Sequence, residues 1–255
     1  MNTICYFISC LLILSSSNSI ADNWRYGVGT ELGALDISGD GGYNSQVGSI
    51  VFDASLSPSD VIDYLTSTLS IKGFASNNKY TINYRIWLLE LGDTVSGAIP
   101  NNDIQVDFEL TQTSKGADIN VEYFFNNQSK NMWSGIVGLY HVSQEYELNI
   151  SLFNQQVRYS KKSADWTDIY IGIKNQHAFS ETFVWENYVR LGAGGSDGYG
   201  AFNSTLVKTW APSWETSLGL NIASFDYQRG ETNSQSFYLY DARETTLNIG
   251  ITYLF

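Results

Sequence analysis

The sequence predicts an all-β fold, a transmembrane antiparallel up-and-down β-barrel of about twelve strands, with ten as the alternative count. Three observations predict it: apolar and polar residues alternate along most of the chain, few residues are charged, and aromatic residues gather near the ends of the alternating runs. Charged residues make up 16% of the chain, against about 25% in soluble proteins. This composition suits strands that turn one face to lipid and the other to a polar lumen.

The N-terminal segment reads as a signal peptide over residues 1–21, which leaves a barrel domain at 22–255. An apolar core from Tyr6 to Leu14 is followed by Ser19-Ile20-Ala21, which places small residues before a cleavage point. The apolar run is shorter than the roughly 20 residues of a spanning helix. Cys5 and Cys10 both lie in this segment, so the exported chain is expected to hold no disulfide, thiol nucleophile or cysteine metal site.

Alternation with a period of two recurs through the rest of the chain. In one example, Ile119, Val121 and Tyr123 alternate with polar residues such as Asn120 and Glu122. A strand places such sets on opposite faces. A soluble sandwich or lipocalin-like barrel would show the same pattern, but the runs exceed the average soluble strand of about 5–6 residues and match the roughly 9–11 residues of a transmembrane strand.

The alternating runs divide the domain into twelve expected strands, at 24–37, 66–76, 79–91, 103–114, 117–126, 132–142, 145–159, 166–178, 181–194, 199–211, 213–228 and 242–255. Short connections are expected near Asn77-Asn78, Ser114-Lys115-Gly116, Ser143-Gln144, Phe179-Ser180 and Pro212. Longer ones are expected at 38–65, 92–102, 160–165, 195–198 and 229–241. A miscounted hairpin at 127–131 or 143–145 would reduce the count to ten.

Aromatic residues near the run ends fit the interfacial girdles of a membrane barrel: Tyr80, Trp133, Trp166, Phe183, Trp210, Trp214 and Tyr253. In the last strand, Leu247, Ile249 and Ile251 alternate with polar residues up to the final aromatic pair. Tyr253 and Phe255 are therefore expected to form the assembly signal of an outer-membrane barrel.

The first long connection contains a local helix signal. Ser57 can cap, Pro58 suits the first helical position, and Asp60 lies in the first turn. Val61, Ile62 and Leu65 share one apolar stripe. The helix is expected to pack on its own loop or to serve as a lid over the lumen mouth.

Ten charged residues are expected inside the lumen: Lys72, Arg85, Asp107, Glu109, Glu122, Lys174, Glu186, Arg190, Glu215 and Glu244. Their mixed signs allow two outcomes. They pair across the lumen and seal it, or they line a narrow water path with a modest cation preference. The net charge of −12 argues against nucleic acid, which requires clustered Lys and Arg.

Signals of chemistry are weak, and no catalytic residue, cofactor or metal is expected. His141 and Ser143, with Asn154 further on, match the residue types of an outer-membrane phospholipase, but the residues around the serine do not match, and His141 is expected at the periplasmic end. The segment Asp36–Gly41 matches half of a calcium loop, whose twelfth position holds Val47 in place of a carboxylate.

Four stretches, taken in order, carry a resemblance: Ser57–Leu65 before a strand, Asp165-Trp166-Thr167-Asp168, Gly192–Gly200 and the closing Thr252-Tyr253-Leu254-Phe255. This order resembles a family of small, mostly uncharacterised outer-membrane β-barrel proteins of Gram-negative bacteria. The resemblance implies Sec-type export, residence in the outer membrane, contact with its lipid and lipopolysaccharide, and delivery by the barrel-assembly machinery. It supplies no catalytic residues.

The leading functional expectation is a non-enzymatic outer-membrane barrel, either a structural or surface protein or a narrow passive pore. The first alternative is an adhesin or ligand-binding barrel that acts through the outer loops at 38–65 and 229–241. An outer-membrane lipid hydrolase is the most remote alternative.

Overall fold

The computed structural model describes residues 24–45, 48–77, 79–99, 104–128, 130–152, 155–232 and 234–255. The expected signal peptide lies outside these residues. The described part consists of eleven strands and one short helix, with these bounds: β1 Arg25–Ser45, β2 Gly48–Asp53, α2 Pro58–Tyr64, β3 Leu65–Ser76, β4 Tyr80–Ile99, β5 Ile104–Gln128, β6 Asn131–Leu152, β7 Gln155–Ser180, β8 Phe183–Gly194, β9 Gly198–Ala211, β10 Trp214–Arg229 and β11 Tyr238–Leu254.

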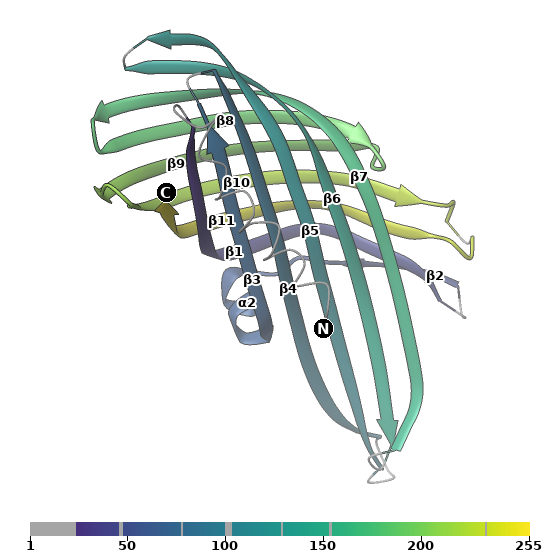
Figure 1. Cartoon of the computed structure of the whole chain (residues 1–255). Helices are drawn as coiled ribbons and strands as arrows, with labels where there is room; N and C mark the ends of the chain where they lie inside the picture. The colour runs from purple at the N-terminus through teal and green to yellow at the C-terminus, as the bar shows by residue number, and fades with distance from the viewer. Residues whose placement is uncertain are drawn as a thin grey trace, which may run out of the picture.

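The strands form one closed antiparallel barrel (Figure 1). Neighbours in sequence pair from β3 through β11, and β1 pairs with both β3 and β11. The closing β1–β11 ladder runs from Gly27 opposite Leu254 to Tyr43 opposite Tyr238. Because β2 pairs with β1 alone, the wall contains ten strands. The antiparallel barrel is confirmed, with the lower of the two expected strand counts.

Long strands account for the difference from twelve. The expected turns at Ser114-Lys115-Gly116 and Ser143-Gln144 are wrong, because β5 and β6 run straight through them. Residues 160–165, expected as a loop, lie inside β7. Five expected strands thus merge into three. One of the wrong turns falls at 143–145, where a miscount was anticipated, and the other falls at 114–116, where none was anticipated.

Connections at the two ends of the barrel differ in kind. The short turns at 77–79, 129–130, 181–182 and 212–213 lie at the end that also carries Arg25 and Leu254. At the other end, β4, β5, β6 and β7 continue past their neighbours, since β3 pairs with β4 only as far as Leu91 and β8 pairs with β7 only from Asp168. We call residues 92–99, 104–111, 142–152 and 155–167 the extension. In Figure 1 it projects to the lower right.

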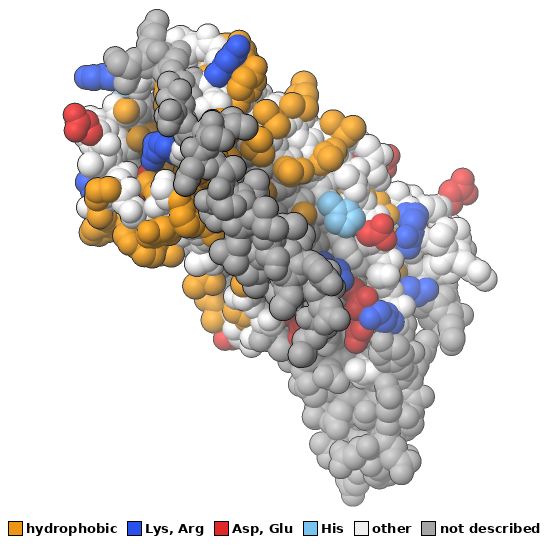
Figure 2. Space-filling view, in the orientation of Figure 1, with side chains coloured by type: hydrophobic (Ala, Val, Ile, Leu, Met, Phe, Trp, Pro, Cys, Tyr) orange, Lys and Arg blue, Asp and Glu red, His pale blue; other side chains and the backbone are white. Residues whose placement is uncertain are grey.

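An apolar belt surrounds the half of the barrel nearer the short turns. Outward side chains there are large, apolar and exposed, as at Leu32 (64%), Ile171 (68%) and Ile249 (67%). Figure 2 shows hydrophobic side chains gathered, on the face in view, over the half that holds the chain's C-terminus in Figure 1. A belt of this kind on a closed barrel is the lipid-facing surface of a transmembrane barrel. No helix within the described ranges is long and apolar enough to span a membrane.

The aromatic girdle is present at the short-turn end. Tyr80, Trp133, Trp210, Trp214 and Tyr253 are all at least 38% exposed there. The expectation for Trp166 is wrong. It is 3% exposed and lies inside the barrel. Exposed Ile169 and Ile171 occupy the outward positions of β7, and Trp166 falls on the alternate, inward set.

The short helix α2 forms as its residues predict. Ser57 Oγ accepts a hydrogen bond from Asp60 N at 3.3 Å, and Ser57 N donates to Asp60 Oδ2 at 2.9 Å. The Ser57 hydroxyl also donates to Asp60 Oδ2 at 2.7 Å, and this bond, followed by the one from Ser57 N, lowers the pKa of Asp60. Val61 is 4% exposed whereas Ile62 is 64% exposed, so only one side of the helix packs on the barrel.

Candidate functional site

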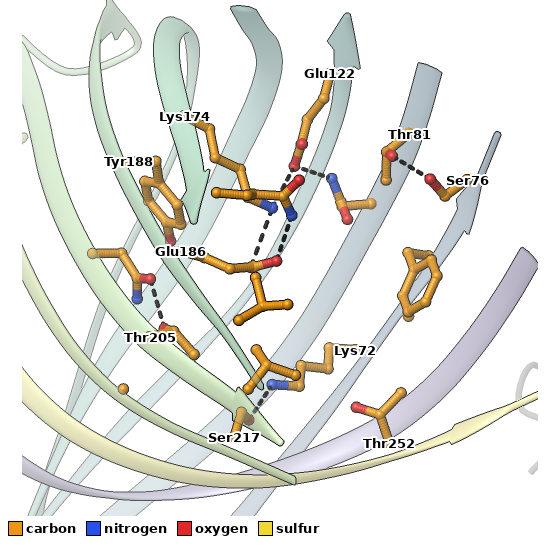
Figure 3. A pocket seen from close by; sticks show the side chains of 18 of the residues that line it. Lys72, Ser76, Thr81, Glu122, Lys174, Glu186, Tyr188, Thr205, Ser217 and Thr252 are labelled. Atoms are coloured by element: carbon orange, nitrogen blue, oxygen red, sulfur yellow. Dashed lines mark hydrogen bonds and ion pairs between the residues drawn. The ribbon is translucent and has the colours of Figure 1, made fainter. Parts of the chain in front are cut away.

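The lumen divides into two zones, and the zone nearer the short turns is a polar cavity. Its volume is about 580 Å³, within the roughly 300–1,000 Å³ range of small-molecule pockets. The lining extends from Arg25 and Asn77 at the short-turn end to Asp118 and Arg190 deeper in the barrel. Figure 3 shows polar side chains from opposite walls that meet across this space.

Charged side chains in the cavity are held in pairs. Glu31 of β1 receives Lys72 Nζ at 3.0 Å and an Arg85 guanidinium nitrogen at 3.2 Å. On the other side, Lys174 Nζ lies 3.3 Å from Glu122 and 3.2 Å from Glu186. Removing a charge from water costs several kcal/mol unless it is paired, and each of these groups has its counter-charge within 4 Å.

The most buried pair joins β5 to β8. Arg190 and Asp118 form an ion pair whose side chains are 5% and 7% exposed. Tyr170 donates its hydroxyl to Asp118 Oδ1 at 2.6 Å, and its ring lies 4.7 Å from the Arg190 guanidinium carbon. At the cavity mouth, Arg25 lies 3.7 Å from Glu215.

The paired set is electrically balanced. Five acidic side chains face five basic ones among the residues that line the cavity: Glu31, Asp118, Glu122, Glu186 and Glu215 against Arg25, Lys72, Arg85, Lys174 and Arg190. The formal sum is zero, so this set gives the cavity no net sign with which to attract a cation or an anion.

The second zone is an aromatic cluster across the lumen. Rings stack in sequence from wall to wall: Trp87 of β4 on Tyr140 of β6 at 5.2 Å, Tyr140 on Tyr199 of β9 at 4.8 Å, and Tyr199 on Phe225 of β10 at 5.4 Å. Phe225 then lies 6.1 Å from Tyr240 of β11. Of these rings, the last four are at most 6% exposed.

A second layer of rings lies on the side of the extension. Trp166 stacks on Tyr227 at 4.3 Å, and Tyr238 lies 6.1 Å from Tyr146. Packed aromatic pairs have centroid separations of about 4.5–7 Å. The Tyr238–Tyr146 pair lies in this range, and the stacked Trp166–Tyr227 pair lies just below it. We call both layers together the aromatic seal, because they fill the lumen where a conducting pore would need open space.

The ten expected lumen charges fall into three groups. Seven line the cavity: Lys72, Arg85, Glu122, Lys174, Glu186, Arg190 and Glu215. Glu244 lies in the aromatic zone, where it accepts a hydrogen bond from the Tyr240 hydroxyl at 2.7 Å. The side chains of Asp107 and Glu109 lie outside the described part of the structure, and their backbone belongs to the extension.

Sequence reasoning missed three charged residues of the cavity, Arg25, Glu31 and Asp118. The last two could have been found from strand parity. Asp118 shares its parity with inward Glu122, and Glu31 alternates with outward Leu32. Arg25 stands at the first residue of β1, where too little strand precedes it to establish a parity.

The weak signals of chemistry do not converge. His141 lies in the middle of β6 rather than at the periplasmic end, exposed, with Nδ1 2.9 Å from Thr167 Oγ1. Asn154 lies outside the described residues. The segment Asp36–Gly41 is part of strand β1, paired along its length with β11, and so forms no calcium loop. Across the described ranges, no group of three His, Cys, Asp or Glu residues is placed to hold a metal.

The chain matches no protein-family model and no curated protein sequence. Among solved structures it is similar to the attachment invasion locus protein Ail of Yersinia pestis, with a TM-score of 0.31 and 11% identity over 91% of this chain and 99% of that one. It is also similar to Neisserial surface protein A, with a TM-score of 0.31 and 12% identity over 90% and 96%, and to the KdgM porin, with a TM-score of 0.30 and 8% identity over 90% and 98%.

These neighbours are outer-membrane β-barrels of Gram-negative bacteria. They include both surface proteins and a porin, and their TM-scores are low. The comparison therefore carries no argument about function, which rests on the geometry of the lumen and wall.

Proposed function

We propose that this protein is a non-enzymatic outer-membrane barrel with a sealed lumen, a structural or surface-exposed protein rather than a passive pore. The aromatic seal is the observation that supports this choice. The electrically balanced cavity also supports the sealed barrel. The seven expected charges that line the cavity all take part in ion pairs, so none of them is left to select ions.

Conductance in a planar lipid bilayer tests the proposal. The unaltered protein is expected to insert without producing current steps. Tyr140→Ala combined with Phe225→Ala removes two stacked rings from the centre of the seal, since they lie 5.7 Å apart. This double variant is expected to give small, ohmic steps.

A matched control removes rings of the same kind from the outer face. Tyr123→Ala with Phe202→Ala alters side chains that are 44% and 39% exposed, and this control is expected to stay silent. The unaltered protein is first shown to be folded by its heat-dependent gel mobility. Stable ohmic current steps from it would then refute the sealed barrel and favour the passive pore.

A second candidate function is recognition at the cell surface by the extension. Its backbone favours this role: β5, β6 and β7 measure 25, 22 and 26 residues, far more than the about 9–11 that cross a membrane. An adhesin of this design loses its binding to cells when the extension is trimmed, whereas a structural barrel is unaffected.

Delivery to the membrane and its lipid contacts belong to the same proposal. Tyr253 and Phe255 are 39% and 72% exposed, and their rings lie 5.0 Å apart. They are suited to act as the signal for the barrel-assembly machinery, after Sec-type export. The apolar belt would then meet outer-membrane lipid, with lipopolysaccharide on the side of the extension.

A further inference from the structure

The barrel wall has one incomplete seam, between β1 and β3. Their ladder contains six residue pairs, from Arg25 opposite Ser76 to Thr30 opposite Ile71, whereas every other ladder of the ten-stranded wall contains at least ten. Beyond Thr30, β1 follows β11 and β3 follows β4. Figure 1 shows the two strands diverging there.

The gap that results has defined edges. No ladder joins residues 31–36 of β1 to residues 65–70 of β3, although the backbone of both segments is described. The gap is closed at one end by Thr30 Oγ1, which donates to Ser70 O at 2.6 Å. At the other end, Ile37 exchanges two backbone hydrogen bonds with Leu56, at 2.9 and 2.8 Å. We call this gap the β1–β3 slot.

The slot lies at the depth of the apolar belt. Leu32 on its β1 edge is opposite Ile249, and both are among the most exposed apolar residues of the belt. Leu69 on the β3 edge is 49% exposed, and Ile62 and Leu65 beside the Leu56 end are 64% and 40% exposed. The outer rim of the slot is therefore apolar on both sides.

The inner lining of the slot is small and polar. Gly33 and Thr68 have inward parity, and both are exposed rather than covered by neighbouring side chains. Ser70 Oγ is buried and has no hydrogen-bond partner in the described structure. The ion-paired Glu31 and Lys72 lie at the closed end.

Unpaired strand edges are costly at this depth. Each backbone N–H or C=O that faces hydrocarbon without a partner costs several kcal/mol, and irregular backbone is tolerated in a membrane only where protein or polar contents satisfy it. An occupant of the slot must therefore offer polar atoms to the backbone and an apolar part to the rim.

We propose that the β1–β3 slot is a lateral binding site for one membrane lipid. The ester and headgroup oxygens of the lipid meet the backbone N–H groups that no ladder joins across the slot, together with Thr68 and Ser70. Its acyl chain lies along the apolar rim of Leu32 and Leu69. The surrounding bilayer supplies this occupant, because the rim is continuous with the lipid-facing belt.

Fluorescence quenching by lipid tests the site in the full chain carrying Cys5→Ser and Cys10→Ser. A single cysteine at Thr68→Cys is labelled with a small fluorophore, and the folded protein is placed in vesicles of phosphatidylcholine brominated near its ester end. The label at position 68 is expected to lose fluorescence to a degree comparable with a label at Ile249→Cys on the outer face.

The matched control is Thr205→Cys. Thr205 lies opposite Gly219, which lies opposite Asn248, which lies opposite Gly33. It is thus an inward threonine at the same level, but in a wall whose ladders are complete. Its label is expected to show no quenching by brominated lipid.

A second pair of variants guards against misfolding at position 68. Ser70→Cys lies in the slot. Its control is Val207→Cys, an inward position in the intact wall at the level of Glu31, through Ser217 and Gly250. Quenching of the slot labels no stronger than that of their controls would overturn the proposal. Quenching of the slot labels by aqueous iodide alone would also overturn it and assign the slot to water. An unquenched label at position 249 would overturn the membrane placement on which the slot depends.

Discussion

At the scale of single residues, burial determines the chemistry of the lumen. Asp118 shows this most clearly, because it receives both the Arg190 guanidinium and the Tyr170 hydroxyl while remaining 5% exposed. An ionised carboxylate at such a position persists only with its partners in place. The residue has no catalytic arrangement around it, so its effect is on stability and on the geometry of β5 and β8.

Arg190→Met is expected to destabilise the barrel by about 3–5 kcal/mol, because it leaves the buried Asp118 charge unpaired. Adding Asp118→Asn removes that charge while keeping an acceptor for Tyr170, so the double variant should recover most of the loss. Urea unfolding in detergent micelles, followed by tryptophan fluorescence, measures both. Equal losses in the single and double variants would contradict this account of the pair.

The sequence predicts which residues face inward, but not which of them pair. Strand parity alone assigns Arg190 and Glu122 to the lumen. The contact between Asp118 and Arg190 spans 72 positions and depends on the number of strands and on the closure of the barrel. The aromatic seal was missed for the same reason, since Trp166 read by itself resembles a girdle residue.

At the scale of elements, the parity of the apolar residues carries more information than their presence. Along β6, Val137 and Leu139 face outward and are exposed, whereas Tyr140, Val142 and Tyr146 face inward and are buried. The apolar set moves to the other face as the strand leaves the lipid, because its outer face then meets water. A change of parity without a turn therefore marks the membrane boundary, and treating such changes as strand ends produced the count of twelve.

Ser57→Ala is expected to loosen α2, because the helix loses the acceptor for Asp60 N. Loss of a serine cap corresponds to roughly fivefold faster opening, measured by amide hydrogen exchange of residues 60–64. Asp63→Asn, which alters an exposed side chain of the helix away from the cap, is the control. Faster exchange in the control to the same extent would assign the effect to something other than the cap.

The same cap gives α2 a dependence on pH. Because the folded pKa of Asp60 is lowered by its bonds to Ser57, the cap contributes fully above the ordinary aspartate pKa of about 3.9. Its contribution is lost as the pH falls through the lower folded value. Exchange of α2 amides in the unaltered protein, corrected for the intrinsic rate, should therefore rise only in strong acid.

At the scale of the whole molecule, the tips of the extension are separable from the barrel. The base of the extension is joined to the barrel, because Trp166 and Tyr146 pack on Tyr227 and Tyr238. Residues 92–99 have no ladder to β3, and residues 155–167 have none to β8, so the strand pairing of the tips runs only among β4, β5, β6 and β7. The tip of the extension contributes no residue to the closing ladder between β1 and β11 or to the aromatic seal.

Trimming both hairpin tips is expected to leave the barrel intact. Removing residues 95–108 joins Thr94 to Glu109, and removing 149–159 joins Leu148 to Ser160, which are already opposite one another. The trimmed chain should keep its heat-dependent gel mobility and lose little stability in urea. Failure to fold would show that the tips are needed to align β5 with β6.

Unequal strand lengths also make the molecule asymmetric in the plane of the membrane. The extension rises from β4 to β7, and the incomplete seam lies next to it, one strand away at β3. A copy that rotates freely about the membrane normal therefore presents a different surface in each in-plane direction. Where copies crowd together, a lipid can reach the β1–β3 slot only from a β3 side that no neighbouring copy blocks.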